Sequence, residues 1–462
     1  MAEAVDEKMK SHTPGSLEAR CMEVIACGMH RAGVVHGLPA LPDDLRRALI
    51  DFLRRSDRLT SNSLAHLLHP AHQRTTWDEL DLSGCTKLSP KGIKGLGDLP
   101  NLTALNLSAT SLQPAAIKEV AALVGLRRLC LDNSWWVEDT CLEQVATLRS
   151  LESLSLVACP CTPHGLKSLS RLTTLRSLNL SQAGKAAASG PQAVIRRSMQ
   201  PPGLRFRDPS LRFLTRLTRL EHLNVAGMGT DGSFLINLNP ATLRELTFGL
   251  PSNGYTARLP EARLSKLTSL THLSIRPCSD TVFGPSRLRT LSRLVDLRLP
   301  MVVFAAPVFA ELLEELPLLR RLSVSVSVLL LRRVESDEPA IECYPDTTAF
   351  PPDLAWLTFN SGTNVPPPAA ARQSTTTTTT TRRQATTTPA PTAALAFQSD
   401  PLTASTLERL AELLLASSSR LAVLKFKGDY PPDMPSMLKA SPLMQLRSLH
   451  TLQHGYQANL LL

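Results

Sequence analysis

Two groups of residues in this 462-residue chain have types that could carry metal or redox chemistry. His66, His69 and His72 recur every three residues, and histidine is the commonest protein ligand for metals. Cys159 and Cys161 are one residue closer than the Cys-x-x-Cys spacing of redox and zinc motifs. No cysteine or further set of ligands accompanies the histidines. The sequence therefore predicts no metal site.

Motifs for phosphate binding and catalysis are also incomplete. The segment from Lys91 to Gly97 reads KGIKGLG, but it lacks the strand-then-helix context of a phosphate-binding loop. No paired carboxylates and no nucleophile motif stand out. We therefore expect a protein that is not an enzyme and needs no cofactor.

The most regular feature of the chain is a repeated frame of leucines. Residues 151–159 read LESLSLVAC, which fits LxxLxLxxC, and the same frame starts at 77, 102, 126, 151 and 175. Successive starts are 25, 24, 25 and 24 residues apart. Further copies start at 220, 243, 270, 294 and 319, with irregular ones at 354, 421 and 446. So constant a period identifies a leucine-rich repeat array.

The physics of one repeat predicts the fold. Alternate leucines of the LxL core point to one side of a short strand, and a helical return segment, such as residues 90–96 or 163–169, brings the chain back. Cys85, Cys159 and Cys278 follow the strand, where a small buried residue fits. We expect a right-handed α/β leucine-rich repeat solenoid of the ribonuclease-inhibitor-like type, with an N-terminal helical cap because an open solenoid end must be covered.

Composition narrows the class of protein further. Hydrophobic residues make up 43% of the chain but aromatic residues only 4%, as an aliphatic leucine core requires. The net charge of +10 is spread without long Lys/Arg runs, so a nucleic-acid partner is not expected. The N-terminus has no apolar signal segment, there is no membrane-length apolar run, and nine dispersed cysteines suit a reducing compartment. These features predict a cytoplasmic or nuclear protein that does not enter a membrane.

Changes in composition predict the following domain boundaries. A disordered start, 1–15, is followed by a helical cap, 16–75, and repeats, 76–182. A flexible insertion, 183–210, separates these from the repeats of 211–360. A low-complexity insertion rich in Pro, Ala and Thr, 361–400, precedes C-terminal irregular repeats, 401–462.

The predicted cap contains two short motifs in sequence. Residues 16–25, SLEARCMEVI, resemble the elongin BC box, a helix that inserts a leucine and a cysteine into elongin C. Residues 41–49, LPDDLRRAL, resemble the cullin-2 box that follows it. Both place apolar anchors on one helix face, as in helix-in-groove recognition.

Together with the repeats, these motifs make residues 16–180 similar to the zyg-eleven/zer-one substrate receptors of elongin–cullin ubiquitin ligases. The family's armadillo-type C-terminal domain has no counterpart in this sequence. The resemblance implies a substrate receptor of a cullin-RING ligase that binds elongin C and a cullin. The implied adaptor-binding residues are Leu17, Cys21, Ile25, Leu41, Pro42, Leu45 and Leu49.

Two alternatives remain open at this stage. The N-terminal helices could serve only as a structural cap on an interaction scaffold without a ligase connection. They could also form a degenerate F-box that begins at Leu41-Pro42 and ends near Trp77, which would replace elongin C by a Skp1-type adaptor.

The strand residues that point away from the core predict a partner-binding concave face. Arginines outnumber acids there, so a protein segment of acidic character is the expected partner. Trp135 and Trp136 add a candidate hot spot. The remaining candidates are Arg127, Arg128, Glu152, Arg176, Asn179, His222, Arg244, Arg276 and Arg298.

Overall fold

The computed structural model describes residues 17–28, 41–68, 77–99, 101–183, 208–228, 230, 232–249, 261–276, 288–299, 316–325, 356–360, 423–427, 436, 451–454 and 458–461. Residues 17–19 and 208–210 and most of the strands beyond 323 are described by their backbone alone. The predicted segments 1–15 and 361–400 and residues 184–207 of the predicted insertion lie outside this set. The chain divides into unit 1 (Met1–Thr230 and Phe234–Leu243) and unit 2 (Asp231–Ser233 and Arg244–Leu462).

Unit 1 begins with three helices, α2 (Leu17–Gly28), α4 (Asp43–Arg55) and α5 (Ser61–Leu67). Acidic Asp43 and Asp44 occupy the first turn of α4, and two arginines occupy its last turn. Both placements suit the helix dipole. Thr60 opens α5 with a capping box, in which Thr60 and Ser63 each accept a hydrogen bond from the other's backbone N–H.

Six strands of unit 1 carry the leucine ladder: β1 (Glu79–Asp81), β2 (Ala104–Asn106), β3 (Arg128–Cys130), β4 (Ser153–Ser155), β5 (Ser177–Asn179) and β6 (His222–Val225). They pair in parallel, each with the next. The register aligns the middle leucine of every repeat, and each of these side chains is at most 5% exposed. The aligned residues are Leu80, Leu105, Leu129, Leu154, Leu178 and Leu223.

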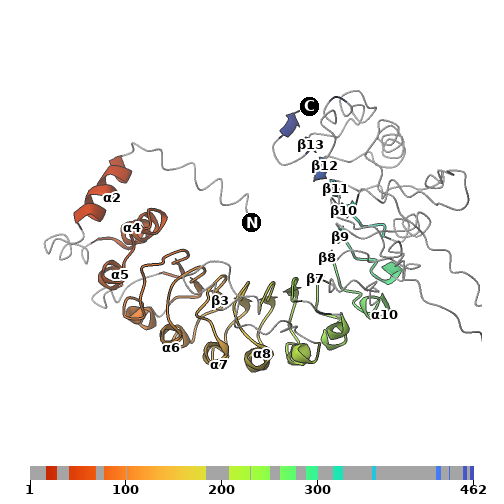
Figure 1. Cartoon of the computed structure of the whole chain (residues 1–462), viewed down its shortest axis with the longest axis horizontal. Coiled ribbons are helices and arrows are strands. Elements are labelled where there is room, and N and C mark those ends of the chain that lie inside the picture. The colour runs from red at the N-terminus through yellow and green to blue at the C-terminus, as the bar shows by residue number, and fades with distance from the viewer. Residues whose placement is uncertain are drawn as a thin grey trace, which may run out of the picture. The chain divides into compact units, whose positions relative to one another are not determined.

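Short helical segments return the chain between these strands. They are η4 (Lys94–Asp98), η5 (Pro114–Ala116), α6 (Ile117–Ala121), α7 (Asp139–Val145), α8 (Pro163–Ser168), η6 (Leu169–Arg171) and η7 (Asp208–Arg216). Figure 1 shows α6, α7 and α8 in a row along one side of unit 1, with the strands along the other. The predicted fold, a parallel-strand leucine-rich repeat solenoid with helices, is confirmed.

The turn after each strand of unit 1 has a fixed backbone geometry. Its second residue lies in the left-handed region, with φ between 54° and 77°, and glycine occupies it in two of the six repeats, where it adopts this φ without strain. The predicted turn cysteines Cys85 and Cys159 are buried, and Cys278 lies outside the described residues. The residues with this left-handed backbone are Gly84, Ala109, Asn133, Ala158, Gln182 and Gly227.

Unit 2 continues the same pattern with β7 (Glu245–Gly249), β8 (His272–Arg276), β9 (Asp296–Leu299), β10 (Arg321–Ser325), β11 (Trp356–Asn360), β12 (Val423–Lys427) and β13 (Thr451–His454). These strands are parallel neighbours in sequence order. A final strand, β14 (Ala458–Leu461), pairs antiparallel with β13. The helical segments of unit 2 include α10 (Glu261–Leu264) and η9 (Leu288–Thr290).

The frame predicted for the last repeat is wrong by three residues. Leu452 lies opposite Leu424 in the register of β12 and β13, so the middle leucine is Leu452 and not Leu449. The chain offers leucines at 446, 449 and 452, and an Leu-x-x-Leu spacing fits either pair. Strand pairing decides between them.

Candidate functional site

Helix α2 has a packed face and an outward face. Met22 and Ala26 are each 7% exposed and lie one turn apart, and α2 contacts α4. Val24 is 72% exposed, and Cys21 is also exposed. We call Cys21 and Val24 the outer face of α2. Because these two residues are three positions apart, they lie on one helix stripe, which is a candidate contact for a partner that binds a helix in a groove.

The residues of the predicted elongin box divide between these two faces. Cys21 lies on the outer face, and Ile25 is half-buried. The side chain of Leu17 lies outside the described residues. Val24 was not predicted as an adaptor contact, although its position three residues after Cys21 and seven after Leu17 is the spacing of a helix stripe.

The residues of the predicted cullin box also divide. Leu49 is fully buried, so its prediction as an adaptor contact is corrected: α4 uses it in the core, on the face that also buries Arg46, Ile50 and Leu53. Leu45 is 40% exposed, Pro42 is exposed and Leu41 is half-buried. The structural-cap alternative therefore accounts for Leu49 but not for Leu45.

Three arginines attach α4 to the first repeat. Arg46 is 2% exposed, pairs with Asp43, donates to the Leu67 carbonyl at 3.3 Å, and lies 5.3 Å from the centre of the Trp77 ring. Arg47 pairs with Asp78 at 3.0 Å and donates to the Glu79 carbonyl at 2.9 Å. These contacts cover the first strand of the sheet, so α4 performs the capping role that a solenoid requires.

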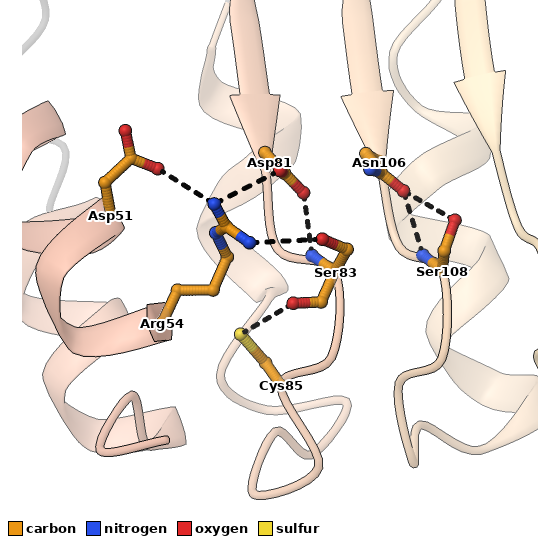
Figure 2. A network of polar contacts seen from close by, with 7 residues as sticks. All are labelled: Asp51, Arg54, Asp81, Ser83, Cys85, Asn106 and Ser108. Carbon is orange, nitrogen blue, oxygen red and sulfur yellow. Dashed lines mark hydrogen bonds and ion pairs between the residues drawn. The ribbon is translucent and has the colours of Figure 1, made fainter. Parts of the chain in front are cut away.

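Arg54 extends this attachment to the end of β1. Figure 2 shows its guanidinium between Asp51 on its own helix and the Asp81 and Ser83 side chains of the first repeat. The distances are 3.7 Å to Asp51, 3.4 Å to Asp81 and 3.3 Å to Ser83 Oγ. The side chain of Asp81 also accepts from the Ser83 backbone N–H at 2.9 Å, which ties the helix to the turn after the strand.

The outward strand residues of unit 1 form a narrow, mostly small and polar surface. Asn106 and Asn179 repeat the Asp81 arrangement, since each accepts from the backbone N–H two residues later at 3.1 Å. In the third and fourth repeats the corresponding residues are Cys130 and Ser155, and in the fourth repeat the side chain of Asp132 is the acceptor instead. Asp132 accepts from Ser155 Oγ at 2.6 Å and from the Val157 N–H at 2.9 Å.

The arginines predicted for this surface are paired with acids in unit 1. Arg127 pairs with Glu152 at 3.4 Å, Arg176 pairs with Glu221, and Arg128 pairs with Glu79. Each pair joins different repeats, and the three arginine side chains are 52–62% exposed. The predicted excess of positive charge is therefore absent from the described strands of unit 1.

The two neighbouring tryptophans differ in position. Trp136 is fully buried and donates from Nε1 to Thr110 Oγ1 at 3.3 Å, so its prediction as a surface hot spot is corrected. Trp135 is half-buried. Among the other predicted contacts, His222 is half-buried, whereas Arg244, Arg276 and Arg298 are exposed on unit 2.

The buried thiols are poorly suited to act as nucleophiles. Burial raises the pKa of Cys85 to about 11, and it also raises the pKa of Cys141 and of Cys159. The thiolate is the reactive form, so these cysteines stay protonated near neutral pH. In the described part of the chain, no three potential metal ligands gather, and His69 and His72 lie outside that part.

Nor do the described residues contain a helix of the length and apolar character needed to cross a bilayer.

No protein-family model and no curated protein matches the chain. Among solved structures, an internalin from Listeria monocytogenes is 16% identical, with 94% of this chain and 97% of that chain covered and a TM-score of 0.43. A leucine-rich repeat protein from Leptospira interrogans is 17% identical, with 85% and 86% covered and a TM-score of 0.42. The yeast Rad7–Elc1 complex is 16% identical, with 90% and 94% covered and a TM-score of 0.40. Similarity at this level carries no inference about function.

Proposed function

We propose that this chain is a non-catalytic protein-binding receptor that presents a target protein to a cullin-RING ubiquitin ligase. In this proposal α2 binds an elongin C-type adaptor, and outward strand residues of the repeats hold the target. The ribonuclease-inhibitor-like subtype and a cytoplasmic or nuclear location belong to the same proposal.

The observation that carries the proposal is the outer face of α2. Helices α4 and α5 contact the first repeat directly, through Arg46, Arg47 and Arg54 of α4 and through Ser61 of α5. Helix α2 packs against α4 and leaves Cys21 and Val24 exposed. A helix needed only as a cap would turn its most apolar residues inward.

The alternative is an interaction scaffold in which all three helices are structural. The complete burial of Leu49 and the attachment of α4 to β1 favour this alternative for α4. It gives no account of Val24, which is 72% exposed on α2. The two candidate functions therefore differ in what they predict for α2 and agree about α4.

A binding measurement with matched variants tests the proposal. Purified elongin BC is titrated into the intact protein, into Val24→Asp and into Val124→Asp. Both valines belong to unit 1 and have similar exposure, 72% and 75%, but Val124 follows α6 and lies outside the cap. We expect Val24→Asp to weaken binding at least about tenfold, because an introduced charge would be desolvated in a helix groove, and Val124→Asp to bind like the unchanged protein.

Two results would overturn the proposal. If Val24→Asp and Val124→Asp bind elongin BC equally well, α2 is not part of the adaptor interface. No binding of elongin BC or of a Skp1-type adaptor by the folded, unchanged protein would leave the scaffold as the better account. Circular dichroism of each variant shows whether a loss of binding reflects a loss of fold.

A further inference from the structure

A buried carboxylate on unit 2 holds two exposed arginines. Asp296 on β9 accepts two hydrogen bonds from Arg298, from Nε at 2.9 Å and from Nη2 at 2.8 Å. Arg321, its register neighbour on β10, approaches the same carboxylate to 3.8 Å. The Asp296 side chain is only 3% exposed, whereas each arginine side chain is 57% exposed.

This arrangement fixes guanidinium groups toward solvent. A two-point contact sets the plane of the Arg298 guanidinium, and the hydrogen bonds with Asp296 raise the pKa of Arg298. Guanidinium has five N–H donors, and Asp296 takes two of those on Arg298. The register neighbours of Arg298 are Ser274 and Ser323, which are small. The remaining N–H donors of Arg298 and Arg321 are therefore available to a second carboxylate. Because Asp296 already orders these two arginine side chains, binding that carboxylate would cost little of their conformational entropy.

The surroundings of this cluster are positive overall. Arg244, Arg276 and Arg320 are exposed, and in the described part of unit 2 they have no carboxylate partner. Among the described residues of this surface the acids are Asp296 and Glu245, and Glu245 lies 3.7 Å from His272. Unlike in unit 1, the described arginines here outnumber the acids that could neutralise them.

We propose that unit 2 binds an acidic protein segment, which places a carboxylate against Arg298 and Arg321. This inference rests on the proposed receptor function and assigns the chemical class of its target. Bidentate pairing with a carboxylate is the geometry that arginine favours. Electrostatic complementarity between the segment and the surrounding arginines would add specificity and speed of association.

The row of register neighbours favours a peptide over a nucleic acid. Glu245, His272, Asp296 and Arg321 follow one another across β7 to β10. A phosphodiester strand carries a charge at every step, so it would bring phosphates against Glu245. A peptide can place one carboxylate on the arginine pair and a neutral residue beside Glu245.

The test uses the full chain and a fluorescein-labelled peptide of alternating Glu and Gly, followed by fluorescence anisotropy at about 0.15 M salt. We expect Arg321→Gln to weaken binding about tenfold, as at an interface hot spot, while leaving Arg298 bound to Asp296. Arg176→Gln is the matched control, since Arg176 is 52% exposed, is paired with an acid and lies on unit 1. It should bind the peptide like the unchanged protein.

The variant Asp296→Asn distinguishes two causes of peptide binding, the orientation of the arginine side chains and the net charge of the surface. It removes one negative charge, so general attraction between charges would strengthen peptide binding. Our proposal expects weaker binding, because the two guanidinium groups lose the carboxylate that orients them. Thermal melting of each variant checks that unit 2 remains folded, and Arg321→Gln keeps the test valid if Asp296→Asn does not fold.

The proposal is overturned if Arg321→Gln binds the peptide unchanged, or if a folded Asp296→Asn binds it more tightly. It is also overturned if a labelled single-stranded oligothymidine binds more tightly than the peptide and depends on Arg321. No adaptor takes part in the measurement. If the peptide does not bind as expected, the α2 proposal still stands. If the α2 proposal fails, the result of the peptide measurement is unaffected.

Discussion

Arg128 on β3 pairs with Glu79 on β1, although an entire strand separates them. The residue between them in the register is Ala104 on β2, and its small side chain leaves the arginine room to reach across. Three repeats are therefore linked through their outward side chains as well as through their leucines.

This pair should contribute little to stability, because its side chains are 58% and 55% exposed. We expect Arg128→Ala and Glu79→Ala each to lower the free energy of unfolding by less than about 1 kcal/mol. Urea denaturation of the two variants and of the double variant measures both effects and their coupling. A coupling energy above about 2 kcal/mol would show that the pair is desolvated in solution.

The neighbouring residues Arg46 and Arg47 should differ strongly in their effects on stability. Arg46→Ala removes a side chain that is only 3% exposed, together with its pair with Asp43, its hydrogen bond to the Leu67 carbonyl and its contact with Trp77. Breaking such a buried pair costs about 3 kcal/mol or more. Arg47→Ala should cost less than about 1 kcal/mol, because its pair with Asp78 is exposed.

Urea denaturation followed by circular dichroism gives both values. Similar losses for the two variants would contradict the described difference in burial. We expect Arg46→Ala to lose more unfolding free energy than Arg47→Ala. We also expect it to bind elongin BC more weakly, because α2 packs against α4.

A glycine in the first repeat marks the close contact with α5. A Cβ at Gly92 would lie 2.6 Å from the Cα of Ser61, and the Ser61 hydroxyl accepts from the Ser89 N–H at 2.7 Å. Gly92→Ala should therefore displace α5 and destabilise unit 1 by about 1–3 kcal/mol, the usual cost of overpacking. Gly125→Ala, where a Cβ would have no atom within 4 Å, is the control.

Thermal unfolding of the two glycine variants provides the comparison. Because Gly125→Ala adds a methyl group without a clash, its melting temperature should stay close to that of the unchanged protein. An equal effect of both substitutions would mean that the contact between Ser61 and Gly92 does not exist in solution.

The burial of Cys85 predicts a change of stability with pH. Its pKa is about 11 in the folded chain, against about 8.5 for a free thiol. Between these two pKa values the unfolded chain loses the proton of the Cys85 thiol while the folded chain keeps it. The stabilising contribution of the buried thiol is therefore fully present below about pH 8.5 and is lost as pH rises to about 11.

Urea denaturation of the unchanged protein and of Cys85→Ala isolates this contribution. The difference in unfolding free energy between the two proteins should shrink from about pH 8 to about pH 10.5, because only the unchanged protein carries the thiol. A difference that stays constant over this interval would contradict the burial of Cys85.

The leucine ladder was predictable because its signal repeats. A single leucine is ambiguous, but starts separated by 24 or 25 residues fix the strand, the inward residues and the turn. The last repeat is ambiguous, because leucines three residues apart at 446, 449 and 452 give two equivalent frames. Only pairing with Leu424 selects one of them.

The candidate sites were less predictable, because they depend on which face of an element meets a neighbour. Met22 and Val24 are both apolar and two residues apart, yet one is 7% exposed and the other 72%. Trp135 and Trp136 differ in the same way. Asp296 lies in register with the outward residue Arg321, yet Arg298 and Arg321 contact its carboxylate, which is only 3% exposed.

The central claim is that an adaptor binds the outer face of α2, and the two cysteines of this helix test it most directly. Cys21 belongs to the outer face, whereas Cys27, which is also exposed, lies about 120° around the helix from Cys21 and contacts Glu23 and Arg58. Alkylation of both thiols is followed by mass spectrometry of their peptides, with and without elongin BC. We expect elongin BC to slow the alkylation of Cys21 several-fold and to leave the rate at Cys27 nearly unchanged. An unchanged rate at Cys21 in a complex that has formed, or no complex at all, would contradict the claim.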